Sequence, residues 1–251
     1  MEGDGCSPYC LREWIPIASS SDPVRVSGSR SGCWTTLSYA SNGVAVDDYQ
    51  NIYVVMVCGG AEAFVATSRD GGLTYGEPVG TGILGSSDVA IVAGERGQVF
   101  VAGLTENSLQ YTWSTDAGES WERPFVLDDS LNQFDVIFFG VTMRYRAGEV
   151  FVSVKDAPCS ESSYVFVADG GSISRTDTEL ATCPGDLLLD PNGSDLWLLG
   201  DVGSLEISRS TDGGPSFHLQ ASELPTVGVF FVGAASNPAS VFGGVAGGRA
   251  V

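Results

Sequence analysis

Three aspartates, Asp88, Asp135 and Asp186, each stand directly before an apolar run, in the stretches DVAI, DVIF and DLLL. If those runs are the innermost strands of a ring of sheets, the three carboxylates gather at the mouth of a central channel. There they could hold a cation, hydrogen-bond sugar hydroxyls or, as a pair roughly 5 to 9.5 Å apart, cleave a glycosidic bond. The simpler interpretation, which we favour, is that each aspartate only ends a turn.

Asp135 and Asp186 are the first pair to consider for catalysis, on this reasoning alone. Lys155 and Asp156 stand in a loop that is expected on the same face as the three aspartates, so all five residues are candidates for ligand binding.

A second group of carboxylates lies in three similar octets, SRDGGLTY (68–75), STDAGESW (114–121) and STDGGPSF (210–217). Each octet offers one acid, which we interpret as the acceptor of backbone N–H groups across a tight turn. The glycine permits backbone angles closed to other residues, and the aromatic is expected to be buried between neighbouring units. Calcium binding is the weaker alternative, because a calcium loop needs six or more clustered oxygens. The residues assigned to these turns are Ser68, Asp70, Gly72, Tyr75, Ser114, Asp116, Gly118, Trp121, Ser210, Asp212, Gly214 and Phe217.

The octets recur at regular spacing. Asp116 follows Asp70 by 46 residues, and Asp212 follows Asp116 by 96 residues, about twice that interval. Degenerate copies occur at VADGGSIS (167–174) and SGSRSGCW (27–34). Regular recurrence of this kind indicates a repeat architecture.

The residues between the octets indicate which elements would position the acids. Apolar runs interrupted by polar turns begin at Val44, Val89, Val136 and Leu187, and each reads as strand, turn, strand. A third strand leads into the octet and a fourth leaves it, so one unit of about 40–50 residues forms a four-stranded blade. The sequence therefore predicts an all-β fold, a β-propeller of four-stranded blades.

Five blades are expected, in a single domain at 21–251 that follows an N-terminal arm at 1–20. Four are continuous, and the fifth is split between the two ends of the chain, which closes the ring and leaves no sheet with an open edge. A fragment of a six-bladed ring or of a longer chain is the alternative. The predicted blades are 44–88, 89–135, 136–186, 187–226, and 227–251 together with 21–43.

The octets resemble the Asp-box, or BNR, repeat found in sialidases, sortilin-like receptors, xyloglucanases and photosystem assembly factors. Three copies match well and two are degenerate, so the resemblance covers nearly the whole chain. It implies a propeller but no particular activity, because this fold hosts many functions.

The residues that sialidases use for catalysis do not carry over to this chain. Sialidases bind the substrate carboxylate with three arginines and have an Arg-Ile-Pro motif near their start, where WIPI has Trp14 in place of the arginine. The clear basic residues on the expected face are Arg123, Lys155 and Arg175, and its acidic mouth would repel a sialate anion.

Composition narrows the classes of partner. The chain has 31 acids against 12 Lys and Arg, a net charge of -19, which disfavours nucleic acid and anionic lipid. It contains no run of 18 apolar residues, so no membrane insertion is predicted. A lone histidine, His218, accompanies six cysteines without a CxxC pair, so neither a metal nor another cofactor is expected.

The even number of cysteines favours disulfides and an oxidising compartment. Cys159 and Cys183 are expected to pair within one blade. For the other four, the pairing of Cys33 with Cys58 and of Cys6 with Cys10 is one option of three. We therefore predict an extracellular, periplasmic or cell-surface location, with the export signal not present in this chain.

The first functional hypothesis is a non-catalytic propeller, secreted or at the cell surface, that binds a protein or a glycan on the face opposite the octets. Such a module is expected to be a monomer. A glycoside hydrolase of sialidase-like type is the runner-up, and an intracellular assembly factor with free thiols is a third possibility.

Overall fold

The computed structural model describes residues 24–34, 43–59, 62–105, 108–129, 140–155, 163–169, 172–178, 184–189, 195–200, 205–213, 216–224, 229–234 and 241–245. The regular elements of these residues are β-strands, so the prediction of an all-β protein is confirmed. Across this part of the chain, no helix is long and apolar enough to cross a membrane.

The first sheet is built around β3, a strongly apolar strand whose side chains are buried on both faces of the sheet. On one edge β3 pairs with β4, which in turn pairs with β5, and on the other edge it pairs with both β1 and β2. All of these pairings are antiparallel. The strands are β1 (Cys33–Trp34), β2 (Val44–Val46), β3 (Ile52–Cys58), β4 (Glu62–Ser68) and β5 (Val79–Leu84).

Three four-stranded sheets follow, each with its strands in chain order and antiparallel. The second sheet contains β6 (Asp88–Ala93), β7 (Val99–Leu104), β8 (Leu109–Ser114) and β9 (Phe125–Asp128). The third contains β10 (Gly140–Arg146), β11 (Glu149–Lys155), β12 (Ser163–Asp169) and β13 (Ser172–Thr178). The fourth contains β14 (Pro184–Leu189), β15 (Leu196–Gly200), β16 (Leu205–Ser210) and β17 (His218–Leu224).

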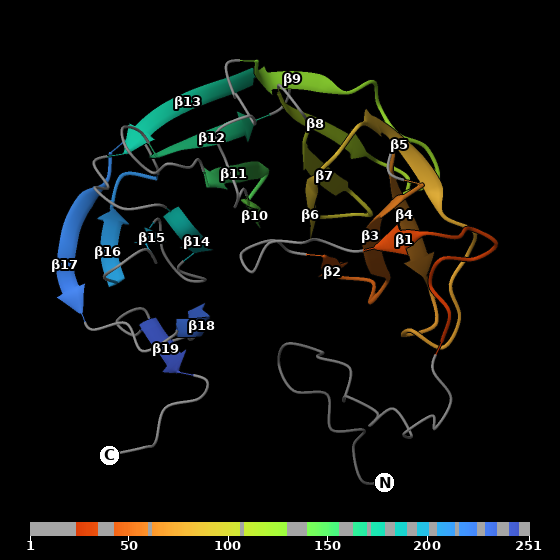
Figure 1. Cartoon of the computed structure of the whole chain (residues 1–251), viewed down its shortest axis with the longest axis horizontal. Coiled ribbons are helices and arrows are strands. Elements are labelled where there is room, and N and C mark those ends of the chain that lie inside the picture. The colour runs from red at the N-terminus through yellow and green to blue at the C-terminus, as the bar shows by residue number, and fades with distance from the viewer. Residues whose placement is uncertain are drawn as a thin grey trace, which may run out of the picture.

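A terminal sheet of two strands, β18 (Val229–Ala234) and β19 (Val241–Val245), comes last. Figure 1 shows the sheets in succession along an arc, with β6, β10 and β14 toward its centre and β9, β13 and β17 on its outside. Strands toward the centre of the arc contact one another in succession, β2 with β6, β6 with β10, β10 with β14 and β14 with β18. Sheets stacked radially in this way are typical of propeller blades.

Apolar side chains from the two faces of each sheet make the core between neighbouring sheets. Because side chains alternate along a strand, Tyr53, Val55 and Val57 of β3 pack against Val89 and Ile91 of β6 in the second sheet. A separate cluster joins the second and third sheets, and a further one joins Phe151 of β11 to the fourth sheet.

The N-terminal side of the structure differs from the prediction. The sequence predicts that 21–43 join 227–251 in a split blade, but β1 pairs with β3, with Cys33 opposite Cys58. In the described residues, β18 and β19 pair only with each other. A disulfide between Cys33 and Cys58 holds β1 in the first sheet, a tertiary constraint that outweighs the weak octet pattern of 27–34.

Candidate functional site

The first octet folds into a turn whose carboxylate is satisfied within the octet itself. Ser68 Oγ donates to Asp70 Oδ1 at 2.8 Å and accepts from the Gly72 N–H at 2.8 Å. Thr74 donates its N–H to Oδ1 and its hydroxyl to Oδ2 of Asp70, at 2.9 and 2.6 Å. The bonds from Thr74, and then that from Ser68, lower the pKa of Asp70 from 3.8 to about 2.

The other two octets repeat this geometry at the same positions. Asp116 accepts from Ser114 Oγ and from both the N–H and the hydroxyl of Ser120, and Asp212 accepts in the same way from Ser210 and Ser216. Hydrogen bonds from Ser120 and Ser216, respectively, are the largest cause that lowers both pKa values to about 2. Among the described residues, no group of three or more His, Cys, Asp or Glu side chains could hold a metal ion. In this geometry the octet acids shape turns.

Octets of successive sheets also contact one another. Arg69 of the first octet forms an exposed ion pair with Glu119 of the second, with Nη2 and Oε1 2.5 Å apart. Thr67 Oγ1 donates to the Ala117 carbonyl at 3.4 Å. Gly118 has a φ of 83°, and a Cβ there would lie 3.1 Å from Thr67 Oγ1. The close approach of two sheets therefore needs glycine at this position.

The three octet aromatics pack in different surroundings. Phe217 is 2% exposed and belongs to the cluster between the third and fourth sheets, and Trp121 packs against the cluster between the first and second. Tyr75 packs on the other face of the first sheet, against the cluster that contains Val54, Met56 and Phe64.

Asp88 is the one channel aspartate whose side chain the structure describes. It begins β6 at the end of the sheets opposite the octets, which we call the opposite end, and it is only 2% exposed. Its Oδ2 accepts the backbone N–H of Val141, at 3.1 Å, in the third sheet. This bond joins two sheets, and the burial weighs against contact between Asp88 and a ligand in the channel.

The other candidate residues are placed only in part. Asp186 lies in β14 opposite Leu199, and Lys155 ends β11 opposite Gly140. Asp135 and Asp156 lie outside the described residues, as do Gly214 and the cysteines Cys6, Cys10, Cys159 and Cys183. Of the predicted disulfides, the Cys33–Cys58 bond is confirmed.

Loops at the opposite end of the second sheet are short and bonded within themselves. Ser87 donates its N–H to the Leu104 carbonyl at 2.7 Å, and Thr105 donates its N–H to the Ser108 carbonyl at 2.8 Å. The hydroxyls of Thr105 and Ser108 are 2.7 Å apart, and Gln110 Nε2 donates to Ser108 Oγ at 3.3 Å. These bonds pair polar groups at this end of the second sheet with one another.

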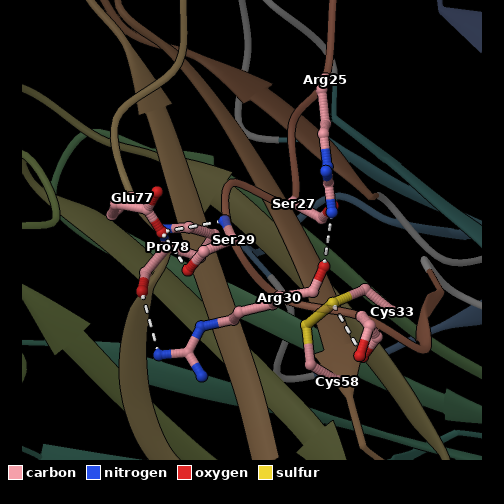
Figure 2. Close-up of a disulfide and its surroundings, with 9 residues drawn as sticks. Arg25, Ser27, Ser29, Arg30, Cys33, Cys58, Glu77 and Pro78 are labelled. Carbon is pink, nitrogen blue, oxygen red and sulfur yellow. Dashed lines mark hydrogen bonds between the residues drawn. A yellow bond between two sulfur atoms is a disulfide. The ribbon is translucent and has the colours of Figure 1, made fainter.

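Sequence reasoning missed the contacts of residues 24–34. This segment follows the predicted N-terminal arm at 1–20, and from here on we call residues 24–34 the arm. Figure 2 shows Ser29 and Arg30 of the arm beside Glu77 and Pro78 of the first sheet. Ser29 donates its N–H and its hydroxyl to Glu77 Oε2, at 3.2 and 3.1 Å. The Arg30 guanidinium lies 3.6 Å from the centre of the Phe64 ring, a cation–π contact. No local pattern marks such partners, which are 48 and 34 residues away along the chain.

Asp47 is a second residue that was missed, although its sequence signal was present. It accepts hydrogen bonds from the Tyr49 and Asn51 N–H groups, from Asn51 Nδ2 and from the Tyr53 hydroxyl. Burial, together with the bond to Asp47, raises the pKa of Tyr53. The stretch DDYQN between two apolar runs is typical of a turn held by its aspartate.

Comparison with known proteins supports the fold class. No protein-family model matches the sequence, and no match is found among curated proteins. The chain is similar to the crystal structure of a protein of unknown function from Dyadobacter fermentans, with a TM-score of 0.52, 15% identity, and coverage of 82% of this chain and 76% of that one. At this identity the likeness shows a shared fold alone.

Two weaker likenesses are to carbohydrate-active enzymes. An ulvan lyase, a polysaccharide lyase, has a TM-score of 0.46 at 12% identity over 72% of this chain. A variant of the NanB sialidase from Streptococcus pneumoniae has a TM-score of 0.47 at 16% identity over 70% of this chain. The matched parts are 55% of the lyase and 28% of the sialidase, so this chain spans about half and about a quarter of those proteins.

Proposed function

We propose that this chain is a non-catalytic β-propeller of five blades, with Asp-box turns, that recognises a glycan or a protein through the loops at its opposite end. The observation that carries the proposal is the position of Asp88, the one of the three predicted channel aspartates whose side chain the structure describes: it is buried and bonded to a neighbouring sheet instead of facing the channel. The hydrogen bonds of Ser87 and Thr105 at this end support a preformed recognition surface, since preorganised sites lose less entropy on binding.

Charge narrows the ligand under this proposal. A net charge of -19 favours a neutral glycan or a basic protein surface over an anionic polysaccharide. The Cys33–Cys58 disulfide is compatible with the proposed secreted or cell-surface location, because such bonds persist in oxidising compartments.

The test is a binding screen of the purified chain against immobilised neutral and anionic glycans, with variants at the two ends of the sheets. Lys155→Ala at the opposite end, and Asp135→Asn, which the sequence predicts on the same face, are expected to weaken binding about tenfold, the size of one lost polar contact. Glu119→Gln, an exposed octet substitution, is the matched control and is expected to leave the affinity within about twofold.

Two outcomes would contradict the proposal. Binding that is lost with Glu119→Gln and kept with Lys155→Ala would place recognition at the octets. Hydrolysis of an aryl glycoside that Asp135→Asn abolishes would identify a glycoside hydrolase instead. Binding to a basic protein but to no glycan would keep the module and change the class of ligand.

A further inference from the structure

The face of the second sheet that points toward the third sheet carries a row of aromatic side chains. Phe125 of β9 and Trp113 of β8 are stacked, with ring centres 5.4 Å apart and ring planes 11° from parallel. The ring centre of Trp113 lies 5.8 Å from that of Tyr111, and the centre of Tyr111 lies 6.2 Å from that of Phe100 in β7. The row therefore crosses the sheet from β7 to its outermost strand, β9, which lies on the outside of the arc in Figure 1.

The inner end of the row is fixed in the core. Phe100 and Tyr111 are buried, and the Phe100 ring also stacks on Tyr145 of the third sheet, with ring centres 5.7 Å apart. A Cβ on Gly94 would lie 2.9 Å from both of these rings, so glycine at this position lets them meet. Because two sheets hold the inner rings, the outer rings of the row are preorganised.

The outer end of the row is open to solvent. Phe125 is 49% exposed, although Leu127, two residues further on the same face of β9, packs against the cluster between the second and third sheets. The outermost strand of the first sheet differs. There Val79 of β5 is half-buried, Ile83 on the same face is fully buried, and β5 contacts β8 of the second sheet. In the described residues, Phe125 thus opens the rim between the second and third sheets.

The repeat does not require aromatic residues at these positions. Tyr111 lies opposite Phe125 and stands three residues before the octet serine Ser114. The equivalent opposed pairs of the first and fourth sheets are Val65 with Val79 and Ile207 with Ala221. Compared with those two sheets, the exposed aromatic surface is therefore particular to the second sheet and is not a demand of the fold.

Charged side chains flank the exposed ring along the chain. Arg123 stands two residues before Phe125 and Asp129 stands four residues after it, and both are exposed. Within the part of the chain that the structure describes, neither side chain has a hydrogen-bond or ion-pair partner. A guanidinium donates hydrogen bonds and a carboxylate accepts them, so the two groups together can hold hydroxyls.

The size of the exposed aromatic surface matches a small group better than a protein. Half of a phenylalanine side chain offers on the order of 100 Å². A stable protein interface takes about 800 Å² from each partner. Val126, the next exposed apolar residue, points to the other face of β9 and does not enlarge the surface. The net charge of -19 disfavours an anionic group, so one neutral, flat ring is the occupant that fits.

We propose that Phe125, backed by Trp113, forms a glycan-binding subsite on the outer rim of the second sheet, on which one sugar ring of a neutral, β-1,4-linked glycan stacks. The equatorial substituents of such a ring leave a flat C–H face, which the negative face of an aromatic ring attracts. The hydroxyls at the edge of the sugar are then available to Arg123 and Asp129. The subsite goes beyond the proposed function, which places recognition at the opposite end, and it does not rest on that function.

The test is a calorimetric titration of the purified chain with three neutral β-1,4-linked hexasaccharides, cellohexaose, xylohexaose and mannohexaose. Phe125→Ala is expected to weaken binding by about tenfold or more, because the sugar loses its aromatic partner. Val126→Ala is the matched control, since Val126 is 56% exposed on the other face of the same strand. It is expected to leave the affinity within about twofold.

Two further variants separate stacking from apolar contact, and they decide the case if Phe125→Ala does not fold. Phe125→Trp keeps an aromatic ring and should keep the affinity. Phe125→Leu keeps an apolar side chain without a ring and should lose as much affinity as Phe125→Ala. The inference is overturned if none of the three hexasaccharides binds, or if Phe125→Leu binds as tightly as the unsubstituted chain.

Lys155→Ala distinguishes failure of this inference from failure of the proposed function. Binding that is lost with Phe125→Leu alone supports the rim subsite and removes these glycans from the opposite end. Binding that is lost with Lys155→Ala alone overturns the rim subsite and keeps recognition at the opposite end. Two sites in each chain, one removed by each variant, would support both.

Discussion

The two ends of the sheets are held together by different means. At the octet end, each of three turns satisfies its own aspartate with residues no more than four positions away. Contacts between octets, such as the exposed ion pair of Arg69 with Glu119, are added to these turns. At the opposite end, beside the short bonds of Thr105 and Ser108, two buried or covalent links join distant segments, Cys33 with Cys58 and Asp88 with Val141, which is 53 residues further along the chain. The same turn is therefore repeated in three sheets at the octet end. The disulfide and the Asp88 bond at the opposite end are each particular to one pair of segments.

The difference predicts that single changes at the opposite end cost more than single changes in an octet. Loss of the disulfide is expected to have the largest effect. Replacing Cys33 and Cys58 with serine should lower the free energy of unfolding by about 3 kcal/mol, because the bond closes a loop of 25 residues in the unfolded chain. Denaturant unfolding with and without a reductant measures this, and an unchanged midpoint would contradict it.

Loss of the buried carboxylate at Asp88 is expected to come next. Asp88→Ala leaves the Val141 N–H without its acceptor inside the interface, at a cost of about 2–3 kcal/mol. Asp88→Asn keeps a carbonyl acceptor and should cost clearly less. Equal losses for the two variants, measured by denaturant unfolding, would mean that charge and not the hydrogen bond matters here.

An octet substitution should have a smaller effect. Ser114 is 1% exposed, donates to Asp116 and accepts from the Gly118 N–H. Ser114→Ala is expected to cost about 1–2 kcal/mol, because one buried N–H loses its partner. Thr115→Ala changes an exposed residue of the same octet and serves as its control. If Ser114→Ala cost more than Asp88→Ala, the contrast between the two ends would fail.

The smallest effect is the pH dependence of the octets. Their three aspartates have a folded-state pKa of about 2 against an ordinary value of 3.8. A depressed pKa contributes stability above the unfolded value, and that stability is lost as the pH falls from about 4 to about 2. Melting curves across this window should show the loss, and Asp116→Asn should flatten it. An unchanged slope in that variant would show that other acids cause the loss.

The same contrast explains how much could be predicted from the sequence. The octets and the all-β class follow from local patterns, and the structure gives the three octet aspartates the same set of hydrogen bonds. The pairing of Cys33 with Cys58 was one option of three, since spacing alone does not select a partner. The burial of Asp88 and the place of β1 depend on packing between distant segments, which no local pattern in one sequence reveals.

The double pairing of β3 has a consequence for self-association. Its sequence, IYVVMVC, is uncharged, apolar and rich in β-branched residues, the composition from which cross-β fibrils grow. A free edge on such a strand would recruit other chains. Here β4 covers one edge, while β1 and β2 share the other, and a covalent bond keeps β1 in place. By holding β1 on the edge of β3, the disulfide thus also protects this fibril-prone strand from pairing with other chains.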